Sequence, residues 1–424
     1  MHIQALYDVF LQHPSVQTDT RKLQPGDIFF ALKGPNFNGN LFAKQALDAG
    51  AACVVVDEDT GFEDKRLFKT DDVLSTLQQL AKYHRQQFNI PFIAITGSNG
   101  KTTTKELVHA VLATTYITYT TKGNLNNHIG IPLTLLSVKK DAQLAVIEMG
   151  ANHQKEIAGY CTYTLPTYGM ITNCGKAHLE GFGGVEGVKK GKGELYDYLR
   201  ANGGTVFLMQ DYDYLVQMAE GIKEVITYGT SGADITGTAR GGECLKVKLV
   251  KGTGIDTINS NLVGDYNLPN ILAAVCVGKY FKVADDKIKA AVENYQPSNS
   301  RSQLIQQGSN KIILDAYNAN PSSMKLAIEN LANMPGADKV LMLGAMAEMG
   351  EASMAEHEAI VQTILAYSWK AVVLVGGDFK KLTHPFHYFD TATEAAAWLK
   401  EQHFENCTLL VKGSRSMQME KVLG

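Results

Sequence analysis

The segment from Ile93 to Thr104 constrains the chain most, because it places a glycine-rich turn between an expected strand and an expected helix. It reads Ile-Ala-Ile-Thr-Gly-Ser-Asn-Gly-Lys-Thr-Thr-Thr, with apolar residues before Gly97 and a helical pattern after Lys101. Glycines let backbone N–H groups approach phosphate oxygens, and a helix N-terminus adds partial positive charge. The segment therefore predicts a nucleotide-binding loop; a chance occurrence of Gly-Lys-Thr is the alternative.

This loop is shorter than the general phosphate-binding pattern. Gly-x-x-x-x-Gly-Lys would place a glycine at position 95, where this chain has Ile95. Lysine can reach the outer phosphates, and the hydroxyl after it can bind Mg²⁺. The expected ATP-binding residues of the loop are Gly97, Ser98, Asn99, Gly100, Lys101, Thr102 and Thr103.

Composition excludes several classes of protein. The 424 residues suffice for two or three domains, with 45% hydrophobic and 20% charged residues. A net charge of −3 argues against general nucleic-acid binding. Six cysteines without Cys-x-x-Cys spacing fit reduced thiols, and no apolar run reaches the length of a membrane span. We expect a cytoplasmic protein, with no signal peptide and no membrane span, that works as a monomer.

Alternating strand and helix patterns predict an α/β fold with three domains. Residues 1–88 resemble a small α/β unit, and residues 89–297 a central parallel sheet with helices on both faces. Within the central region, residues 225–262 consist of short β-rich pieces with many Gly and Thr, which predict an antiparallel appendage. Gln296–Ser300 is the expected linker, because Pro and small polar residues end a helix there. Residues 298–424 are expected to form a second, Rossmann-like doubly wound unit.

Several polar residues follow expected strands, where open α/β sheets bind ligands. Glu148 ends one strand and His178 follows the next, and with the Thr102 hydroxyl they could bind Mg²⁺. The alternative is that Glu148 caps a helix and His178 is a loop histidine. A lysine-rich stretch at 189–192 is typical of a solvated face, and composition does not distinguish one of its lysines from another.

Four further stretches could bind substrates. Residues 121–132 are rich in Asn, which donates and accepts hydrogen bonds, although a glycine-bounded loop explains them equally. Residues 18–22 could hold an anion or form a polar surface turn. At 315–321, Asp315 could bind ribose hydroxyls, and Tyr317 or Asn318 could lie against a base. Arg301 could close onto phosphates, and residues 412–416 could bind a carboxylate or phosphate.

Together these stretches resemble the Mur ligase family over essentially the whole chain. The short loop is the one shared by Mur ligases and folylpolyglutamate synthase. More specific are six ordered motifs, at 123–127, 148–153, 177–183, 315–324, 343–350 with His357, and 410–417. These are most similar to the branch that adds D-Ala-D-Ala to UDP-N-acetylmuramoyl-tripeptide. Where the family often has Asp-Gly-His, this chain has Asn38-Gly39-Asn40.

The resemblance implies an ADP-forming ligase of peptidoglycan synthesis, which works through an acyl phosphate and serves cell shape and division. It implies catalytic roles for Lys101, His178 and Lys192, and it implies that Lys192 is carbamylated. The implied metal ligands are Thr102, Glu148, His178 and Lys192. Beyond the loop, the implied ATP-binding residues are Asn267, Asn270, Arg301, Asp315 and Asn318. The implied substrate-binding residues are Thr20, Arg21, Asn124, Asn126, Asn127, Lys412 and Ser414.

Alternatives to this function come from two classes. One is another Mur ligase or a folylpolyglutamate synthase-like ligase, against which the Asn-Leu-Asn-Asn and Gly-Ala-Asn-His sequences argue. The other is a P-loop nucleotide-binding module without ligase chemistry, which would bind nucleotide and form no amide.

Overall fold

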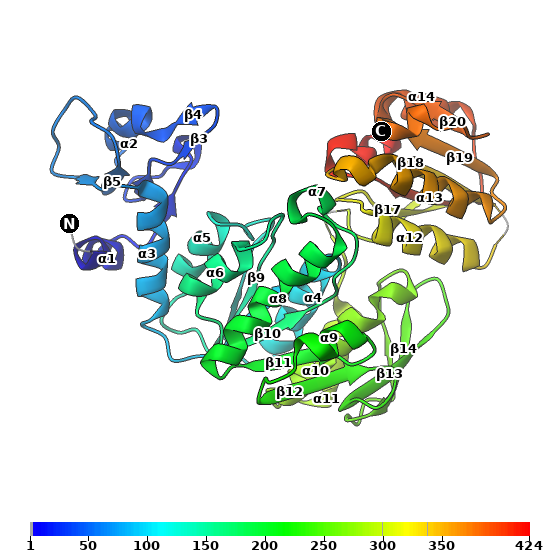
Figure 1. Ribbon diagram of the computed structural model, residues 1–424, viewed down its shortest axis with the longest axis horizontal. Coiled ribbons are helices and arrows are strands. Elements are labelled where there is room, and N and C mark those ends of the chain that lie inside the picture. The colour runs from blue at the N-terminus through cyan, green and yellow to red at the C-terminus, as the bar shows by residue number, and fades with distance from the viewer. Residues whose placement is uncertain (1–2, 299, 337) are drawn as a thin grey trace. The chain divides into compact units, whose positions relative to one another are not determined.

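The computed structural model describes residues 3–298, 300–336 and 338–424 (Figure 1). By their internal contacts these residues divide into two compact units. The first unit comprises the described part of Met1–Ala94 with Tyr116–Ala151 and Lys155–Gly169. The second comprises Ile95–Thr115, Asn152–Gln154 and the described part of Met170–Gly424. Strands β7 (Phe92–Thr96) and β10 (Tyr168–Ile171) have residues in both units, so each unit is built from separate stretches of chain.

The first unit begins with a small parallel sheet. Its order is β1-β2-β5-β6, and its strands are β1 (Val16–Gln17), β2 (Ile28–Phe30), β5 (Cys53–Val56) and β6 (Leu67–Lys69). Its middle strands are apolar on both faces, as buried parallel strands are, and helix α2 (Ala43–Asp48) packs on β5. Strands β3 (Lys33–Gly34) and β4 (Phe37–Asn38) form a short hairpin beside it.

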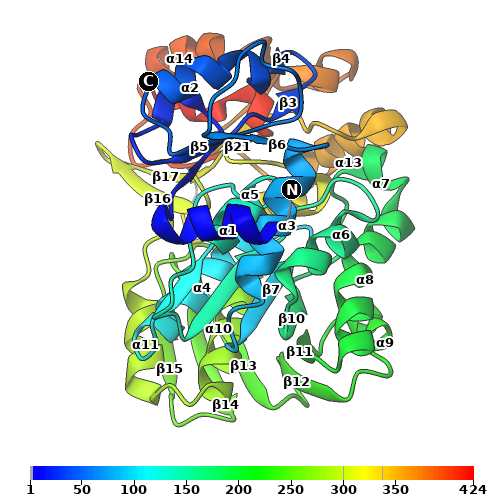
Figure 2. The same cartoon turned by 90° about the vertical axis from the view of Figure 1, so that its left-hand side faces the viewer.

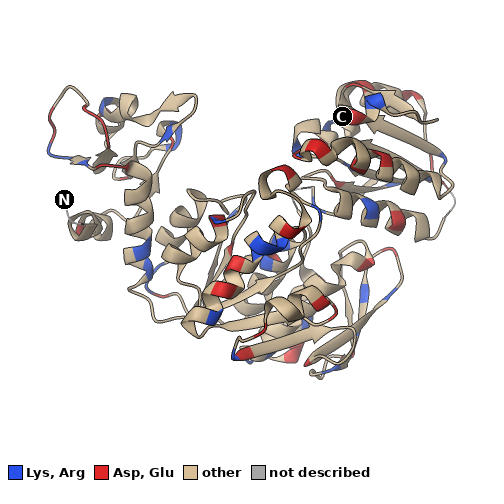
Figure 3. Cartoon of the chain, viewed as in Figure 1, with Lys and Arg blue, Asp and Glu red and all other residues tan. Residues whose placement is uncertain are grey.

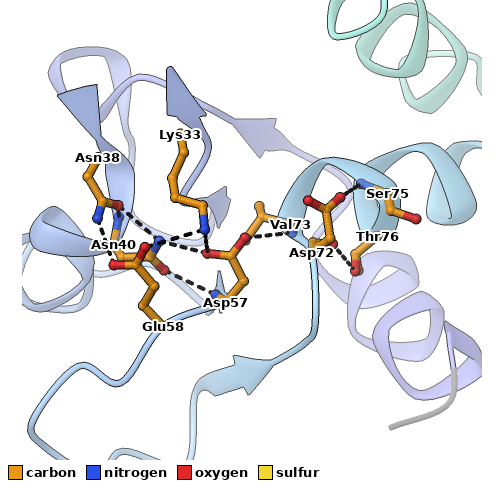
Figure 4. A network of polar contacts seen from close by, with 9 residues as sticks. All are labelled: Lys33, Asn38, Asn40, Asp57, Glu58, Asp72, Val73, Ser75 and Thr76. Atoms are coloured by element: carbon orange, nitrogen blue, oxygen red, sulfur yellow. Dashed lines mark hydrogen bonds and ion pairs between the residues drawn. The ribbon is translucent and has the colours of Figure 1, made fainter. Parts of the chain in front are cut away.

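The helices at 3–12 and 73–85 of this unit are among those not predicted from the sequence. Helix α3 (Val73–Arg85) is capped at its N-terminus by Asp72, whose carboxylate accepts a hydrogen bond from the Ser75 backbone N–H (Figure 4). Helix α1 (Ile3–Gln12) packs against α3 (Figure 2), where the Tyr7 hydroxyl lies 3.1 Å from His84 Nδ1. The unit also holds β8 (Thr118–Thr120), β9 (Leu144–Glu148), α5 (Gly130–Leu136) and α6 (Glu156–Thr164).

A nine-stranded sheet has the order β15-β14-β13-β12-β11-β10-β7-β9-β8. Its strands in the second unit are β11 (Thr205–Met209), β12 (Glu224–Gly229), β13 (Ile235–Arg240), β14 (Lys246–Lys251) and β15 (Thr257–Asn259). The expected antiparallel appendage is correct for β13, β14 and β15 and wrong for β12, which pairs in parallel with β11 and β13. The helices here are α4 (Lys101–Ala113), α7 (Leu179–Phe182), α8 (Val185–Asn202), α9 (Asp213–Met218), α10 (Leu268–Tyr280) and α11 (Asp285–Asn294).

The last part of the second unit is a six-stranded sheet of order β16-β17-β21-β18-β19-β20. Only β16 (Gln303–Gln307) is antiparallel to its neighbour among the described strands of this sheet. The others are β17 (Asn310–Asp315), β18 (Lys339–Gly344), β19 (Ala371–Val375), β20 (His387–Phe389) and β21 (Thr408–Lys412). Helices α12 (Pro321–Asn333), α13 (Ser353–Leu365) and α14 (Ala392–Glu401) alternate with them, as a doubly wound unit requires.

Charge and hydropathy agree with the composition. Basic and acidic residues are interspersed along the ribbon (Figure 3). Among the described residues, no helix has the length and apolar character needed to cross a membrane. All six cysteines are free thiols, and five of them are buried.

Candidate active site

The phosphate loop connects β7 to α4 and requires glycine at two positions. Gly97 has φ +143°, and a Cβ there would lie 2.0 Å from Thr172 Oγ1. Gly100, the N-cap of α4, has φ +79°, and a Cβ there would lie 2.6 Å from Asn270 Oδ1. Any side chain would therefore be strained and would displace a neighbour. The backbone can turn sharply here and present the first N–H groups of α4 to a phosphate.

Residues after β10 hold this loop in place. The Asn99 N–H donates to Asn173 Oδ1 at 3.0 Å, and the Thr172 hydroxyl donates to the Asn99 carbonyl at 2.6 Å. The Ser98 hydroxyl donates to the Gly175 carbonyl at 2.9 Å. Sequence reasoning gave Thr172 and Asn173 no role, although polar residues directly after a buried strand are the signal that could have found them.

Lys101 lies over the loop that precedes it. Its Nζ donates to the Gly97 carbonyl at 2.7 Å and to the Ser98 carbonyl at 3.1 Å. Thr102, in the first turn of α4, is buried, with 4% of its surface exposed. The ammonium group is therefore held against carbonyl oxygens of the loop, and its contact with a nucleotide phosphate stays a prediction.

Asn267 and Asn270, which were both predicted to bind ATP, contact each other. Asn270 Nδ2 donates to Asn267 Oδ1 at 2.8 Å, and Asn267 Nδ2 donates to the Val263 carbonyl at 2.8 Å. The Thr104 hydroxyl donates to Asn270 Oδ1 at 3.0 Å, which joins α10 to α4. Both side chains are buried. The Asn270 amide lies next to Gly100 and, through its hydrogen bond with Thr104, supports the first turn of α4.

The segment around His178, which was predicted to bind a metal ion, contacts residues that are far away in the sequence. His178 Nδ1 contacts Glu348 Oε2, and the Lys176 ammonium lies 2.5 Å from Glu356 Oε1. The hydrogen bond with His178 is the largest cause that holds the pKa of Glu348 below its ordinary value, and the charge of His153 contributes. Segments 176–180 and 348–356 of the second unit are thus joined by two polar pairs.

The structure separates the lysines that composition left equivalent. Lys192 is 1% exposed, and its Nζ lies 4.9 Å from the centroid of the Phe182 ring. Lys189 forms an ion pair with Glu186 at 2.8 Å near the surface of α8, and Lys190 is exposed. A buried ammonium carries a large desolvation cost, so Lys192 is the unusual one of the three.

Residues predicted to bind ATP and a residue predicted to bind the substrate contact each other at the ends of β17 and β21. Lys412 Nζ lies 2.5 Å from Asp315 Oδ2 and 3.3 Å from the Asn318 carbonyl. The Arg301 guanidinium lies 3.7 Å from the centroid of the Tyr317 ring. The Ser414 hydroxyl donates to the Ala345 carbonyl at 2.6 Å. Lys412 and Ser414 therefore help to hold this strand edge together.

Asn320 links this strand edge to the phosphate loop. It caps α12, with Oδ1 accepting from the Ser323 N–H at 2.9 Å, and its Nδ2 donates to Asn99 Oδ1 at 2.8 Å. The Lys176 N–H donates to Ser322 Oγ at 3.0 Å. Sequence reasoning missed Asn320 and Ser322, and the Asn-Pro sequence at the helix start was the available signal.

In the first unit, Glu148 is the buried carboxylate at the end of β9. Asn126 Nδ2 donates to its Oε1 at 2.8 Å, and its backbone N–H donates to Thr121 Oγ1 at 3.0 Å. Asn127 instead stabilises a turn, with Oδ1 accepting from the Gly130 N–H at 2.8 Å. Asn124 is exposed. The turn at Asn127 fits the loop alternative, Asn126 contacts Glu148 instead, and substrate binding by this Asn-rich stretch stays a prediction.

Thr20 and Arg21 lie in a short surface turn. The Arg21 guanidinium pairs with Asp19 at 2.7 Å, and 87% of the arginine side chain is exposed. Hydrogen bonds from Arg21 hold the pKa of Asp19 down at about 2. This geometry fits a polar turn and leaves the guanidinium accessible to an anion.

The Asn38-Gly39-Asn40 sequence has a structural role (Figure 4). Asn40 Nδ2 donates to Asp57 Oδ1 at 2.8 Å, and Asn40 Oδ1 accepts from the Asp57 N–H at 3.1 Å. Asn38 Oδ1 accepts from the Asn40 N–H at 3.0 Å, and Lys33 lies 3.2 Å from Asp57. Asn40 therefore pairs with Asp57 through both its side-chain donor and its acceptor.

Among the residues described, no group of three or more His, Cys, Asp and Glu side chains forms a metal site. The donors that the sequence predicted are a hydroxyl, a carboxylate and an imidazole, on Thr102, Glu148 and His178. Oxygen donors such as the first two are of the kind that Mg²⁺ prefers, and a role of these residues at a metal ion stays a prediction.

Three family models match successive parts of the chain. The one described as "Mur ligase family, catalytic domain" matches residues 14–94, "Mur ligase middle domain" residues 95–278, and "Mur ligase, glutamate ligase domain" residues 300–415. They agree with the predicted three-domain α/β fold, while the boundaries at 88 and 297 stay a prediction.

Similar proteins span nearly the same length. The UDP-N-acetylmuramoyl-tripeptide–D-alanyl-D-alanine ligase of Escherichia coli (strain K12) is 37% identical, over 96% of this chain and 92% of that protein. The crystal structure of MurF from Acinetobacter baumannii superposes with a TM-score of 0.88 at 31% identity, covering 96% of this chain and 92% of that one. The MurF ligase of Thermotoga maritima, in complex with ADP, gives a TM-score of 0.89 at 26% identity and covers 97% of each chain.

Proposed function

The chain belongs to the Mur ligase family, and we propose that it joins D-Ala-D-Ala to UDP-N-acetylmuramoyl-tripeptide while ATP is split to ADP and phosphate. The observation that carries the proposal is the phosphate loop, in which Gly97, Gly100 and Lys101 surround the start of α4 within a chain of this family. In this role the protein would work as a cytoplasmic monomer in peptidoglycan synthesis, and so in cell shape and division.

The reaction needs activation, because a peptide carboxylate is a poor electrophile. Transfer of the terminal phosphoryl group of ATP makes it an acyl phosphate. The amine of D-Ala-D-Ala then attacks the acyl carbon, phosphate leaves, and an amide remains. N–H groups at the start of α4 and the Lys101 ammonium would stabilise the charge on the transferred phosphoryl group. Closure of the third domain would exclude water that hydrolyses the acyl phosphate.

Mg²⁺ is the proposed ion, and when bound it neutralises charge on the phosphate oxygens. The proposed ligands are Thr102 and Glu148 for one ion, with His178 for a second. The buried hydroxyl of Thr102 and the buried carboxylate of Glu148, oriented by Asn126, fit a hard cation that prefers oxygen.

We also propose that Lys192 is carbamylated. Its neutral amine would add to CO₂ and lose a proton, which replaces a cation with a carboxylate that can bind metal. Burial to 1% exposure against Phe182 supports this, since an ammonium group is costly there. A carbamate ¹³C resonance in protein equilibrated with ¹³C-bicarbonate, lost in Lys192→Ala and kept in Lys189→Ala, tests it; no such resonance in the unsubstituted chain would reject it.

The remaining predicted roles stand as proposals for the substrates. Thr20 and Arg21 would contact the UDP end, while Asn124, Asn126, Asn127, Lys412 and Ser414 would also bind substrate. Asn267, Asn270, Arg301, Asp315 and Asn318 would complete the ATP site. The exposed guanidinium of Arg21 and the buried amides of Asn267 and Asn270 beside the loop support their assignments.

Phosphate release tests the function. It should depend on both UDP-N-acetylmuramoyl-tripeptide and D-Ala-D-Ala, and parallel reactions with meso-diaminopimelate and L-lysine tripeptides would identify the third residue. Release with a single amino acid, or with a folate, would favour a different ligase of this fold. Nucleotide binding without amide product would favour a binding module.

A further inference from the structure

His178 and Glu348 meet although they are 170 positions apart in the sequence. Both have left-handed backbone conformations, with φ of 52° for His178 and 60° for Glu348. Non-glycine residues rarely adopt this conformation, and they keep it where surrounding contacts impose it. Two strained positions therefore bring one imidazole and one carboxylate into contact.

Contacts before and after His178 hold its loop against the start of α12 and against the segment from Glu348 to Glu356. The Lys176 N–H donates to Ser322 Oγ at 3.0 Å, and the Lys176 ammonium pairs with Glu356 at 2.5 Å. The Glu180 N–H donates to the Glu348 carbonyl at 3.4 Å. The loop that carries His178 is thus fixed before and after the histidine, and Glu348 reaches it from the loop after β18.

The chemistry of the pair gives the two ring nitrogens different roles. An ionised carboxylate accepts hydrogen bonds and donates none, so the proton of the contact lies on His178 Nδ1. In a neutral imidazole the lone pair is then on Nε2. The ring keeps access to solvent, since 20% of the His178 side chain is exposed. Carboxylates that orient a histidine in this way tune its affinity for a metal ion.

We propose that Glu348 is a positioning residue, which fixes the Nδ1–H tautomer of His178 and so offers Nε2 to the metal ion that accompanies ATP. This inference rests on the proposed metal-binding role of His178. Since Glu348 follows β18, the histidine is oriented only while the segment from Glu348 to Glu356 lies against the loop of His178.

The tautomer can be measured in the metal-free protein by ¹⁵N NMR of labelled histidines at pH 8. His178→Gln assigns the resonance by its loss. We expect a protonated Nδ1 and an unprotonated Nε2 in the unsubstituted chain, and a shift toward the Nε2–H tautomer in Glu348→Ala. A tautomer that does not change in Glu348→Ala, or an imidazole protonated on both nitrogens, overturns the proposal.

Metal affinity gives a second readout, with Mn²⁺ as the probe and ADP present, followed by electron paramagnetic resonance. Glu348→Ala should weaken Mn²⁺ binding about 10–100-fold, and Glu348→Gln less, because its amide oxygen still accepts from Nδ1. Glu356→Gln is the matched control, since it removes a pair between the same two segments that involves no imidazole. It should change the affinity less than twofold.

Two outcomes of the Mn²⁺ experiment contradict the inference. Equal weakening in Glu348→Ala and Glu356→Gln would mean that the contact only joins the segments. An unchanged affinity in His178→Gln would remove the premise. Neither outcome touches the proposed ligase reaction, which fails only if the unsubstituted chain forms no amide from its two substrates.

Discussion

The Lys412 ammonium lies 2.5 Å from the Asp315 carboxylate, where the parallel strands β21 and β17 place the two residues opposite each other. Lys412 is 2% exposed on its side chain and Asp315 is 17% exposed. The Ser302 N–H donates to the other carboxylate oxygen at 3.0 Å. The ion pair therefore joins the two strand ends, and the hydrogen bond from Ser302 adds the segment that follows the expected linker.

Asp315→Asn should destabilise the protein, because it leaves a buried ammonium without its counter-charge. We expect a loss of about 3 kcal/mol in the free energy of unfolding, measured by urea denaturation. Asp390→Asn is the control, since Asp390 pairs with Lys380 at 2.9 Å on the surface. The control should lose less than about 1 kcal/mol. Equal losses in the two variants would contradict the structural role of Lys412.

Gly100→Ala should weaken ATP binding at least about tenfold, from the cost of φ +79° together with displacement of Asn270. Isothermal titration calorimetry with a non-hydrolysable ATP analogue measures the effect. Gly308→Ala is the matched control, because Gly308 also has positive φ, at +60°, and open space around its Cβ position. Loss of affinity in both variants would show that backbone strain alone, and not the contact with Asn270, explains the result.

Substitutions of Asn320 separate helix capping from the contact with Asn99. Asn320→Asp keeps the capping oxygen and loses the Nδ2 donor, whereas Asn320→Ala loses both. ATP affinity should fall about fivefold in each, corresponding to one hydrogen bond. Only Asn320→Ala should also lose about 1 kcal/mol of stability. Asn333→Asp, an exposed position on the same helix, controls for the added charge. Unchanged ATP affinity in Asn320→Asp would contradict a role at the loop.

Stability should depend on pH through His84. Burial lowers its pKa below the ordinary 6.5, while its contact with the Val138 carbonyl partly opposes the shift. Below pH 6.5 the unfolded chain therefore binds more protons at this site than the folded chain. His84 thus makes stability fall as pH decreases from 6.5, by at most about 1.4 kcal/mol per pH unit. Thermal unfolding from pH 8 to pH 5 should show a smaller pH dependence in His84→Gln, and an identical dependence would contradict the assignment.

Elements with a strong local pattern could be predicted from the sequence. The alternation of strands and helices expected for residues 298–424 is confirmed, with strands β17, β18, β19 and β21 and helices α12, α13 and α14. Strands β16 and β20 were missed because they lie at the two edges of the sheet and carry no long apolar run. Helix α3 was missed although Asp72 and the apolar positions Leu77 and Leu80 mark it.

The site was predictable where one segment carries it and not where distant segments meet. The phosphate loop could be predicted, since strand, glycines and helix follow one another. The contact between Asn99 and Asn320 joins positions 221 apart, so no local pattern reports it. Lys192 differs from Lys189 and Lys190 in its burial, which depends on how α8 packs.

The central claim is that the chain forms an amide between UDP-N-acetylmuramoyl-tripeptide and D-Ala-D-Ala. Mass spectrometry of a reaction with ATP and Mg²⁺ tests it most directly, with phosphate measured in parallel. We expect one pentapeptide product per phosphate released, and no product for Lys101→Ala. Phosphate release that is independent of D-Ala-D-Ala, or nucleotide binding without any pentapeptide product, would contradict the account.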